Sequence, residues 1–166
     1  MTFTYAEVGA TRSALLDGAP LPDGYDHVLR HVPIKSEFRT AADALARWEP
    51  QWGAGLKVRT DADRAAAGVR FATGLGAGPL RLWAPCEVVW LVDEPDRYGF
   101  GFGTLDGHPE RGEEAFLVSV AADGTVWFDV LAFSWPARWW ARVGHAFARR
   151  LQARVTDRYV RAMERV

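Results

Sequence analysis

Five titratable side chains lie close together in the segment 106–114 and are the strongest candidates for chemistry in the sequence. Four carboxylates around one imidazole could bind a divalent cation or transfer protons. A metal site normally draws its ligands from more than one loop, so a charged hairpin in which Arg111 pairs with an acid is the favoured interpretation. We therefore predict no metal site and keep His108 and Glu114 as candidates for acid–base catalysis. The five residues are Asp106, His108, Glu110, Glu113 and Glu114.

Asp129 is a second candidate, because it interrupts an apolar strand pattern between Phe128 and Val130. A buried carboxylate is unfavourable unless it is paired or protonated, so a cavity-facing Asp129 would be an acid or a polar anchor. Arg138 or Arg142 could then be its partner. On a solvent-facing side of the sheet the same residue would have no functional meaning.

Residues 97–104 alternate glycine with aromatic residues in the string RYGFGFGT. A dinucleotide fingerprint would need glycine where Thr104 or Asp106 stands, and a Walker-type loop would need Gly-Lys-Ser/Thr, so a phosphate-binding loop is excluded. A strand explains the spacing, because a period of two puts Tyr98, Phe100 and Phe102 on one face and three glycines on the other.

Two placements of this strand remain open. In one, the glycines admit a helix or leave room for a ligand, and the aromatic side chains face outward beneath the N-terminal segment or a partner. In the other, the aromatic side chains are the walls of an interior pocket.

The elements that must position these residues follow from hydrophobic periodicity. Short turns separate most of the expected strands, which favours an antiparallel meander. A short helix is expected from a Ser36 cap to Trp48, ended by Pro50, and a long one over 134–165, capped by Ser134. Residues 15–26 are expected to be loop, and 79–94 to present one unbroken apolar face that includes Cys86, Val88 and Trp90. The expected strands are 27–35, 55–60, 68–75, 79–94, 97–104, 113–121 and 125–133.

Composition limits the class of protein. The chain has 166 residues, a formal net charge of −1 and a single cysteine, Cys86, so we expect one domain, no internal disulfide and no general attraction to nucleic acid. Eight arginines in 134–165 are interpreted as the solvated face of an amphipathic helix. The first ten residues do not form a signal peptide and no apolar run spans a membrane, so we predict a cytoplasmic protein without membrane insertion.

One strand, a short helical region, six strands and a long C-terminal helix resemble the helix-grip fold of START-like domains, the superfamily of Bet v-type allergens and polyketide cyclases. The chain is also similar to a widespread family catalogued only as a domain of unknown function. The similarity lies in FTYAEVGAT (3–11), in 83–116, where GTLDGHPERGEE (103–114) is most specific, and in GTVWFDVLAFSWPARWW (124–140). Lys35-Ser36-Glu37 departs from the glycine-rich turn that the family implies. The resemblance implies an α+β fold over residues 1–166, with six to seven antiparallel strands curved around the last helix and a loop-rich extension at 1–26.

A surplus of aromatic residues, in a fold that encloses a concavity, predicts that a hydrophobic or aromatic small molecule binds between sheet and helix. No cofactor is expected, and the oligomeric state stays open. Two alternatives are a cyclase- or hydrolase-type enzyme, using Asp129 or the Asp106–Glu114 loop, and a filled-cavity module that binds a protein. The expected lining residues are Trp90, Tyr98, Phe100, Phe102, Phe116, Phe128 and Trp140.

Overall fold

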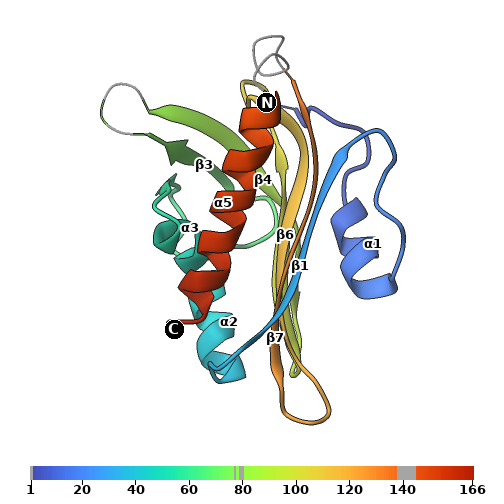
Figure 1. The fold of residues 1–166 in the computed structure, drawn as a ribbon, viewed down its shortest axis with the longest axis vertical. Helices are drawn as coiled ribbons and strands as arrows, with labels where there is room; N and C mark the ends of the chain where they lie inside the picture. The colour runs from blue at the N-terminus through green and yellow to red at the C-terminus, as the bar shows by residue number, and fades with distance from the viewer. Residues whose placement is uncertain (1, 77, 79–80, 138–144) are drawn as a thin grey trace.

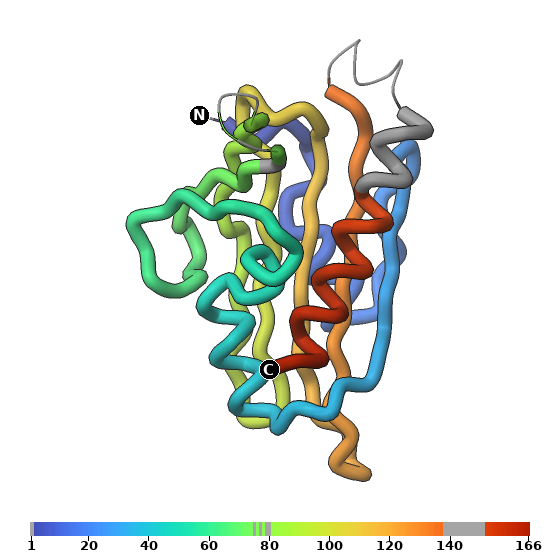
Figure 2. Tube along the Cα trace, turned by 60° about the vertical axis from the view of Figure 1, so that its left-hand side comes forward, coloured from blue at the N-terminus to red at the C-terminus, as the bar shows by residue number. Residues whose placement is uncertain are grey.

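The computed structural model describes residues 2–76, 78, 81–137 and 145–166, and is built around one seven-stranded antiparallel sheet in the order β1-β7-β6-β5-β4-β3-β2. Helix α5 crosses one face of the curved sheet together with α2 and α3, and α1 covers part of the opposite face (Figures 1 and 2). We call the α5 side the inner face and the α1 side the outer face. The helices are α1 (Ala10–Asp17), α2 (Phe38–Ala46), α3 (Glu49–Gly53) and α5 (His145–Met163). The strands are β1 (Asp26–Ile34), β2 (Lys57–Arg59), β3 (Arg70–Leu75), β4 (Leu82–Asp93), β5 (Arg97–Thr104), β6 (Glu110–Val120) and β7 (Val126–Pro136).

The strand order follows from the lengths of the connections. Short turns join β4 to β5, β5 to β6 and β6 to β7, so these four strands form a meander. Strand β1 pairs with β7 at the far edge, and the chain then crosses the inner face through α2 and α3 to reach β2. The predicted antiparallel sheet around a C-terminal helix is confirmed.

The inner face carries the main hydrophobic core. Phe100, Phe116 and Phe128, from three neighbouring strands, have no exposed surface. Tyr159 of α5 meets the Phe116 ring edge-on, with 5.1 Å between ring centroids. Trp48, which follows α2, packs against Phe100 at 5.4 Å. The aromatic face of β5 therefore points inward.

The outer face of β5 is the glycine face, and its empty space receives the N-terminal segment. A Cβ atom at Gly103 would lie 2.8 Å from the Tyr5 ring. At Gly101 it would lie 2.6 Å from the indole of Trp90 and 2.9 Å from the hydroxyl of Thr11. The placement with the glycines toward the C-terminal helix and the aromatic side chains outward is therefore wrong: the aromatic side chains face α5, and the glycines admit Tyr5 and Thr11 on the outer face.

A β-bulge in β4 overturns the expected unbroken apolar face. Val88 pairs with Phe102, whereas Trp90 pairs with Gly101, so the register shifts between them. The extra residue interrupts the alternation of side chains, so the residues after the bulge point to the face opposite to the one that the sequence pattern indicates. Cys86 and Val88 belong to the inner core, whereas Trp90 lies on the outer face with Val92. The predicted position of Trp90 inside the sheet–helix space is therefore wrong.

The expected ends of the short helix are also corrected. Glu37, not Ser36, caps α2, because its carboxylate accepts the Thr40 amide at 3.1 Å. The helix ends at Ala46, and Trp48 adopts a left-handed backbone with φ of 68°. Pro50 stands in the first turn of α3, where proline is tolerated, and starts a helix instead of ending one.

The ends of the chain differ from expectation in a similar way. Strand β7 continues to Pro136, so Ser134 lies in a strand and does not cap the last helix. The described helix α5 begins at His145. Within the segment expected to be loop, residues 15–17 are the last turn of α1. Helix α1 forms although its sequence has almost no amphipathic pattern, because packing on the glycine face stabilises it.

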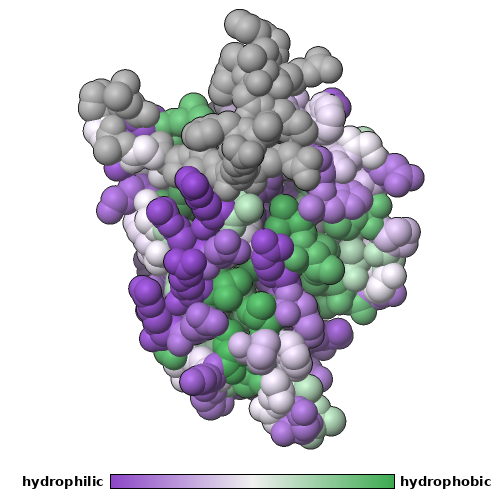
Figure 3. All heavy atoms as spheres, in the orientation of Figure 1, coloured by the Kyte–Doolittle hydropathy of each residue, from purple (hydrophilic) through white to green (hydrophobic). Residues whose placement is uncertain are grey.

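The described arginines of α5 lie on its solvent side, as in Arg154 and Arg161. Arg158 donates to the carbonyl of Ala54, and Asp157 pairs with Arg30 of β1 at 3.6 Å. Hydrophilic side chains gather over this part of the molecule (Figure 3). None of the described helices has the length and apolar composition that a bilayer span requires.

We predict that Gly101→Ala lowers the free energy of unfolding by about 1–3 kcal/mol, because the added methyl group overpacks the space beneath Trp90 and Thr11. Urea denaturation measures the loss. A Trp90→Ala background supplies the control, since removing the indole should reduce the cost of Gly101→Ala by about 1 kcal/mol. If Gly101→Ala lowers the free energy of unfolding equally in both backgrounds, the Trp90 indole is not what restricts position 101 to glycine.

Candidate functional site

Most of the predicted lining residues lie in a closed part of the core. Phe100, Phe116 and Phe128 have no exposed surface, and Phe102 and Tyr98 are 7% and 6% exposed. The Phe116 ring lies 5.9 Å from Phe100 and 6.1 Å from Phe128. These rings fill the space that they were expected to enclose, so a ligand cannot lie against Phe100 or Phe128 without rearrangement. Trp140 is outside the described residues.

Glu114 is the carboxyl group on the inner face. It stands on β6 between Phe102 of β5 and Ala132 of β7, two residues before Phe116. Burial, and secondarily the charge of Glu110, raise the pKa of Glu114 to about 8. The carboxyl group forms no hydrogen bond or ion pair within the described part of the chain. Near neutral pH it is therefore mainly protonated, and it can donate a hydrogen bond.

Two further polar groups lie within the electrostatic reach of Glu114. Burial raises the pKa of the Tyr159 hydroxyl and of the Cys86 thiol, and the Glu114 charge raises both further. On α5, Thr156 and Gln152 lie about one and two turns before Tyr159, and the Thr156 hydroxyl donates to the Gln152 carbonyl at 3.0 Å. We call Cys86, Glu114 and Tyr159 the inner acidic site.

A groove of about 310 Å³ leads from the surface to one side of the inner acidic site. Cys86 and Phe71 form part of its wall, and both also belong to the inner core. At its rim the Arg59 guanidinium lies 3.6 Å from the centre of the Trp83 ring. The groove is lined by Arg59, Thr60, Asp61, Arg70, Phe71, Ala72, Pro85, Cys86 and Leu105.

Glu113, the residue before Glu114, points to the outer face and is 2% exposed. Its carboxylate accepts hydrogen bonds from Tyr5 Oη at 2.7 Å, from the Gly9 amide at 2.8 Å and from the Thr11 amide at 3.0 Å. The Thr11 hydroxyl also donates to it, and Trp90 Nε1 donates to that hydroxyl at 2.9 Å. Four donors satisfy this buried acid, so its role is to hold the N-terminal segment.

The rest of the 106–114 segment does not converge on one reaction centre. Asp106 accepts hydrogen bonds from the amide and hydroxyl of Thr2, at 3.3 and 3.0 Å. His108 Nδ1 lies 3.0 Å from the Glu110 amide nitrogen, and burial lowers the pKa of His108 to about 4. In the described part of the chain, no three His, Cys, Asp or Glu side chains are arranged to hold a metal ion. Of the acid–base candidates in this segment, only Glu114 faces the interior.

Asp129 lies on the outer face of β7, away from the sheet–helix space. Its carboxylate is 2.5 Å from Nδ1 of His31, its neighbour on β1, and the His31 ring stacks on Trp127 at 4.1 Å. Burial raises the pKa of Asp129, and the His31 hydrogen bond opposes that rise. Within the described residues the partner is thus His31, whereas Arg138 and Arg142, the partners suggested by the sequence, lie outside them. No sequence pattern linked Asp129 and His31, which are 98 positions apart.

The architecture and the inner acidic site define a class: a helix-grip protein in which a carboxyl group on the concave side of the sheet, Glu114, has no partner among the described residues. A family model for a domain of unknown function, DUF1990, matches residues 4–162. The chain therefore belongs to this family, as the resemblance implied.

Curated relatives of the chain carry the name UPF0548 protein. One from Deinococcus radiodurans is 49% identical over 79 residues, which are 48% of this chain and 40% of the relative. Another from Arabidopsis thaliana, At2g17695, is 36% identical over 72 residues, which are 39% of this chain and 35% of the relative. The matched segment thus spans less than half the length of each of these relatives.

Solved structures share the fold at low sequence identity. The hypothetical protein jhp0584 from Helicobacter pylori has a TM-score of 0.66 at 11% identity, covering 98% of this chain and 96% of its own. TTHA0849 from Thermus thermophilus has a TM-score of 0.60 at 14% identity, with coverage of 84% and 95%. Ginseng major latex-like protein 151 from Panax ginseng reaches 0.55 at 15% identity, with coverage of 84% and 95%. At these identities the similarities establish the fold alone.

Two adjacent glutamates allow a matched test of the two faces. Glu113→Gln should lower the free energy of unfolding by about 3 kcal/mol, because an amide puts N–H donors against buried donors that need an acceptor. Glu114→Gln removes no hydrogen bond, and it takes away the carboxylate whose ionisation stabilises the unfolded state, so it should leave stability at pH 7 unchanged or raise it. Chemical denaturation compares them, and equal losses would contradict the division of roles.

Glu114 also predicts a pH dependence of stability. Its pKa rises from 4.5 to about 8 on folding, so between these values the folded state holds a proton that the unfolded state has lost. The free energy of unfolding should therefore fall as pH rises from about 4.5 to about 8, by at most about 1.4 kcal/mol per pH unit. Denaturation of wild type and Glu114→Gln across this range measures the difference. Parallel curves would contradict the raised pKa.

Proposed function

We propose that the protein is a cytoplasmic binder of a hydrophobic or aromatic small molecule, held between the sheet and α5 at the inner acidic site. The observation that carries the proposal is Glu114, an inward carboxyl group without a partner in the described part of the chain. Glu114 is half-buried, so its missing hydrogen bond is unfavourable by less than the roughly 1–3 kcal/mol of a fully buried polar group. A ligand that supplies the missing acceptor offsets this term.

The surroundings of Glu114 favour a mostly apolar ligand with one hydrogen-bond acceptor. Phe102 and Phe116 lie beside it on β5 and β6, and Tyr159 is opposite on α5. A protonated carboxyl group donates to a carbonyl, ether or hydroxyl oxygen without placing a charge in the apolar interior. An anionic ligand is less favoured, because its negative charge would repel the ionised form of Glu114.

Within the predicted lining set, the structure favours the members near Glu114. Phe102 remains a proposed ligand contact beside Glu114, and Trp140 remains a proposed contact outside the described residues. Phe116 has no exposed surface and is proposed to support the site from the closed core. Phe100 and Phe128 are proposed to support the site from the closed core, and Tyr98 is grouped with them. The groove beside Cys86 is proposed as the entrance.

Catalysis is the second candidate, and the raised pKa of Glu114 is the observation that favours it. A carboxyl group that titrates near neutral pH can act as a general acid or base, as a cyclase or hydrolase would require. Tyr159 is the neighbouring group that could share a proton with it. Asp129 is not proposed for this reaction, because it lies on the other face of the sheet.

The binding proposal is tested with two uncharged probes of similar size, 2-acetylnaphthalene, which carries an acceptor oxygen, and 2-ethylnaphthalene, which does not. Isothermal titration should show about fivefold tighter binding of the ketone, the value of one net hydrogen bond. Glu114→Leu should abolish this preference and Glu114→Gln should retain it, because glutamine still donates.

The exposed Glu164→Leu is the control variant, and it should retain the preference for the ketone. Native mass spectrometry of the protein purified from cells complements the titration, because a co-purifying molecule identifies the natural ligand. Equal affinities for the two probes, or a preference that survives Glu114→Leu, would contradict the role of Glu114.

A further inference from the structure

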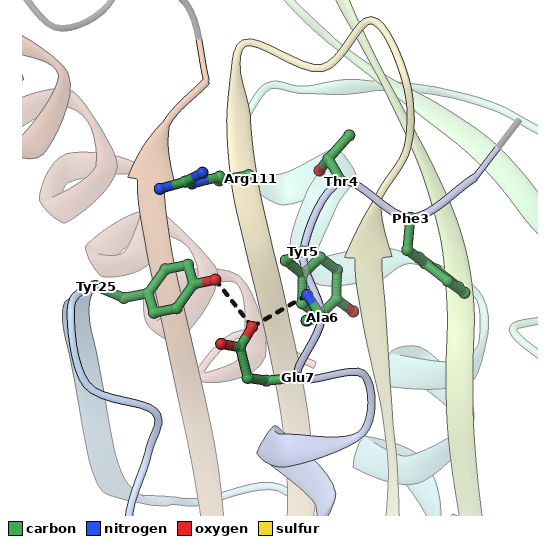
Figure 4. A pocket seen from close by; sticks show the side chains of 7 residues that line it. All are labelled: Phe3, Thr4, Tyr5, Ala6, Glu7, Tyr25 and Arg111. Carbon is green, nitrogen blue, oxygen red and sulfur yellow. Dashed lines mark hydrogen bonds between the residues drawn. The ribbon is translucent and has the colours of Figure 1, made fainter.

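A second pocket lies on the outer face, between the N-terminal segment and the start of β6 (Figure 4). Its volume is about 360 Å³, in the range of small-molecule sites. Glu7, Tyr25 and Arg111 reach it from three separate segments: the strand-like N-terminus, the loop after α1, and β6. The full lining is Phe3, Thr4, Tyr5, Ala6, Glu7, Tyr25 and Arg111.

The negative side of this pocket is the carboxylate of Glu7. Its Oε2 accepts hydrogen bonds from Tyr25 Oη at 2.9 Å and from the Ala6 amide at 3.1 Å. The Tyr25 bond is the largest cause that lowers the pKa of Glu7. Glu7 is therefore ionised at neutral pH and fixed in direction, with its other oxygen, Oε1, unbonded within the described residues.

The positive side is the guanidinium of Arg111. It has no hydrogen bond and no ion pair within the part of the chain that the structure describes. Its charge helps to lower the pKa of Glu7, yet the two groups do not come within the 4.0 Å of an ion pair. Opposite charges thus face one hollow and remain separated across it.

The aromatic walls are held by packing on β7. The Tyr5 and Tyr25 rings both meet Phe133 edge-on, with centroid distances of 5.6 and 5.0 Å. Phe3 in turn meets Tyr5 at 5.9 Å. The pocket therefore combines two separated charges with a preformed aromatic surface.

We propose that this pocket binds a free aromatic α-amino acid, with its carboxylate on Arg111 and its ammonium group on Glu7. Arginine recognises carboxylates with two parallel hydrogen bonds. A ligand with one charge is attracted by one side of the pocket and repelled by the other, whereas a zwitterion satisfies both. The aromatic side chain packs on the half-buried ring of Tyr25, because Tyr5 is only 8% exposed. This site is on the opposite face from Glu114 and does not rest on the function proposed there.

The test uses three probes that share a phenyl group: L-phenylalanine, phenylacetate and 2-phenylethylamine. NMR titration of the full chain should shift the amide signals of Glu7, Tyr25 and Arg111. L-Phenylalanine should bind about threefold tighter than either singly charged probe, and not more than about fivefold, because an exposed ion pair contributes less than about 1 kcal/mol.

Two variants test the contributions of the Arg111 and Glu7 charges one at a time. Arg111→Gln should remove the preference for L-phenylalanine over 2-phenylethylamine, and Glu7→Gln should remove the preference over phenylacetate. Arg154→Gln, an exposed arginine on α5, should change neither ratio. Phenylacetate binding as tightly as L-phenylalanine, or no shift at these amides at millimolar amino acid, would overturn the proposal.

Discussion

The buried carboxylate of Glu113 is the interaction on which the two-sided arrangement of this protein depends. It accepts four hydrogen bonds from three residues of the N-terminal segment, and so fixes Tyr5, Gly9 and Thr11 against the outer face of the sheet. That segment can approach only because β5 has glycine at positions 99, 101 and 103 of its outer face. The glycines and Glu113 therefore act together. The glycines leave space on the outer face of β5, and the Glu113 carboxylate binds the N-terminal residues that fill this space.

The same arrangement gives the adjacent residues Glu113 and Glu114 different roles. In a β-strand successive side chains point to opposite faces, so once Glu113 is fixed outward, Glu114 must point inward. Outside, the N-terminal segment supplies every donor that the carboxylate needs. Inside, the neighbours are aromatic rings and the hydroxyl of Tyr159, so the second acid is left protonated. One satisfied and one unsatisfied carboxyl group therefore follow from a single strand register.

Periodicity was sufficient to predict the strands and their meander, because a half-buried strand shows its pattern locally. Periodicity gave a wrong prediction where a β-bulge or tertiary packing changes the direction of the side chains. The apolar alternation through Val88 and Trp90 looks continuous, and the bulge between them is invisible in residue types. Ser134 has the chemistry of a helix cap but continues β7, because pairing with β6 and β1 outweighs a local preference. Helix α1 lacks an amphipathic pattern, so only its tertiary packing could reveal it.

The candidate site shows the same limit at the level of chemistry. The segment 106–114 is rich in titratable groups, yet most of them are used in structure: Asp106 binds Thr2, and Glu113 binds residues 5–11. The strings 3–11 and 103–114, which carried the family resemblance, are therefore two halves of one contact. Residue types could show that acids gather here, but not which face each one meets. Once those contacts are removed from the set, Glu114 is the member left facing the interior without a partner in the described chain, and this is why the chemistry is assigned to it.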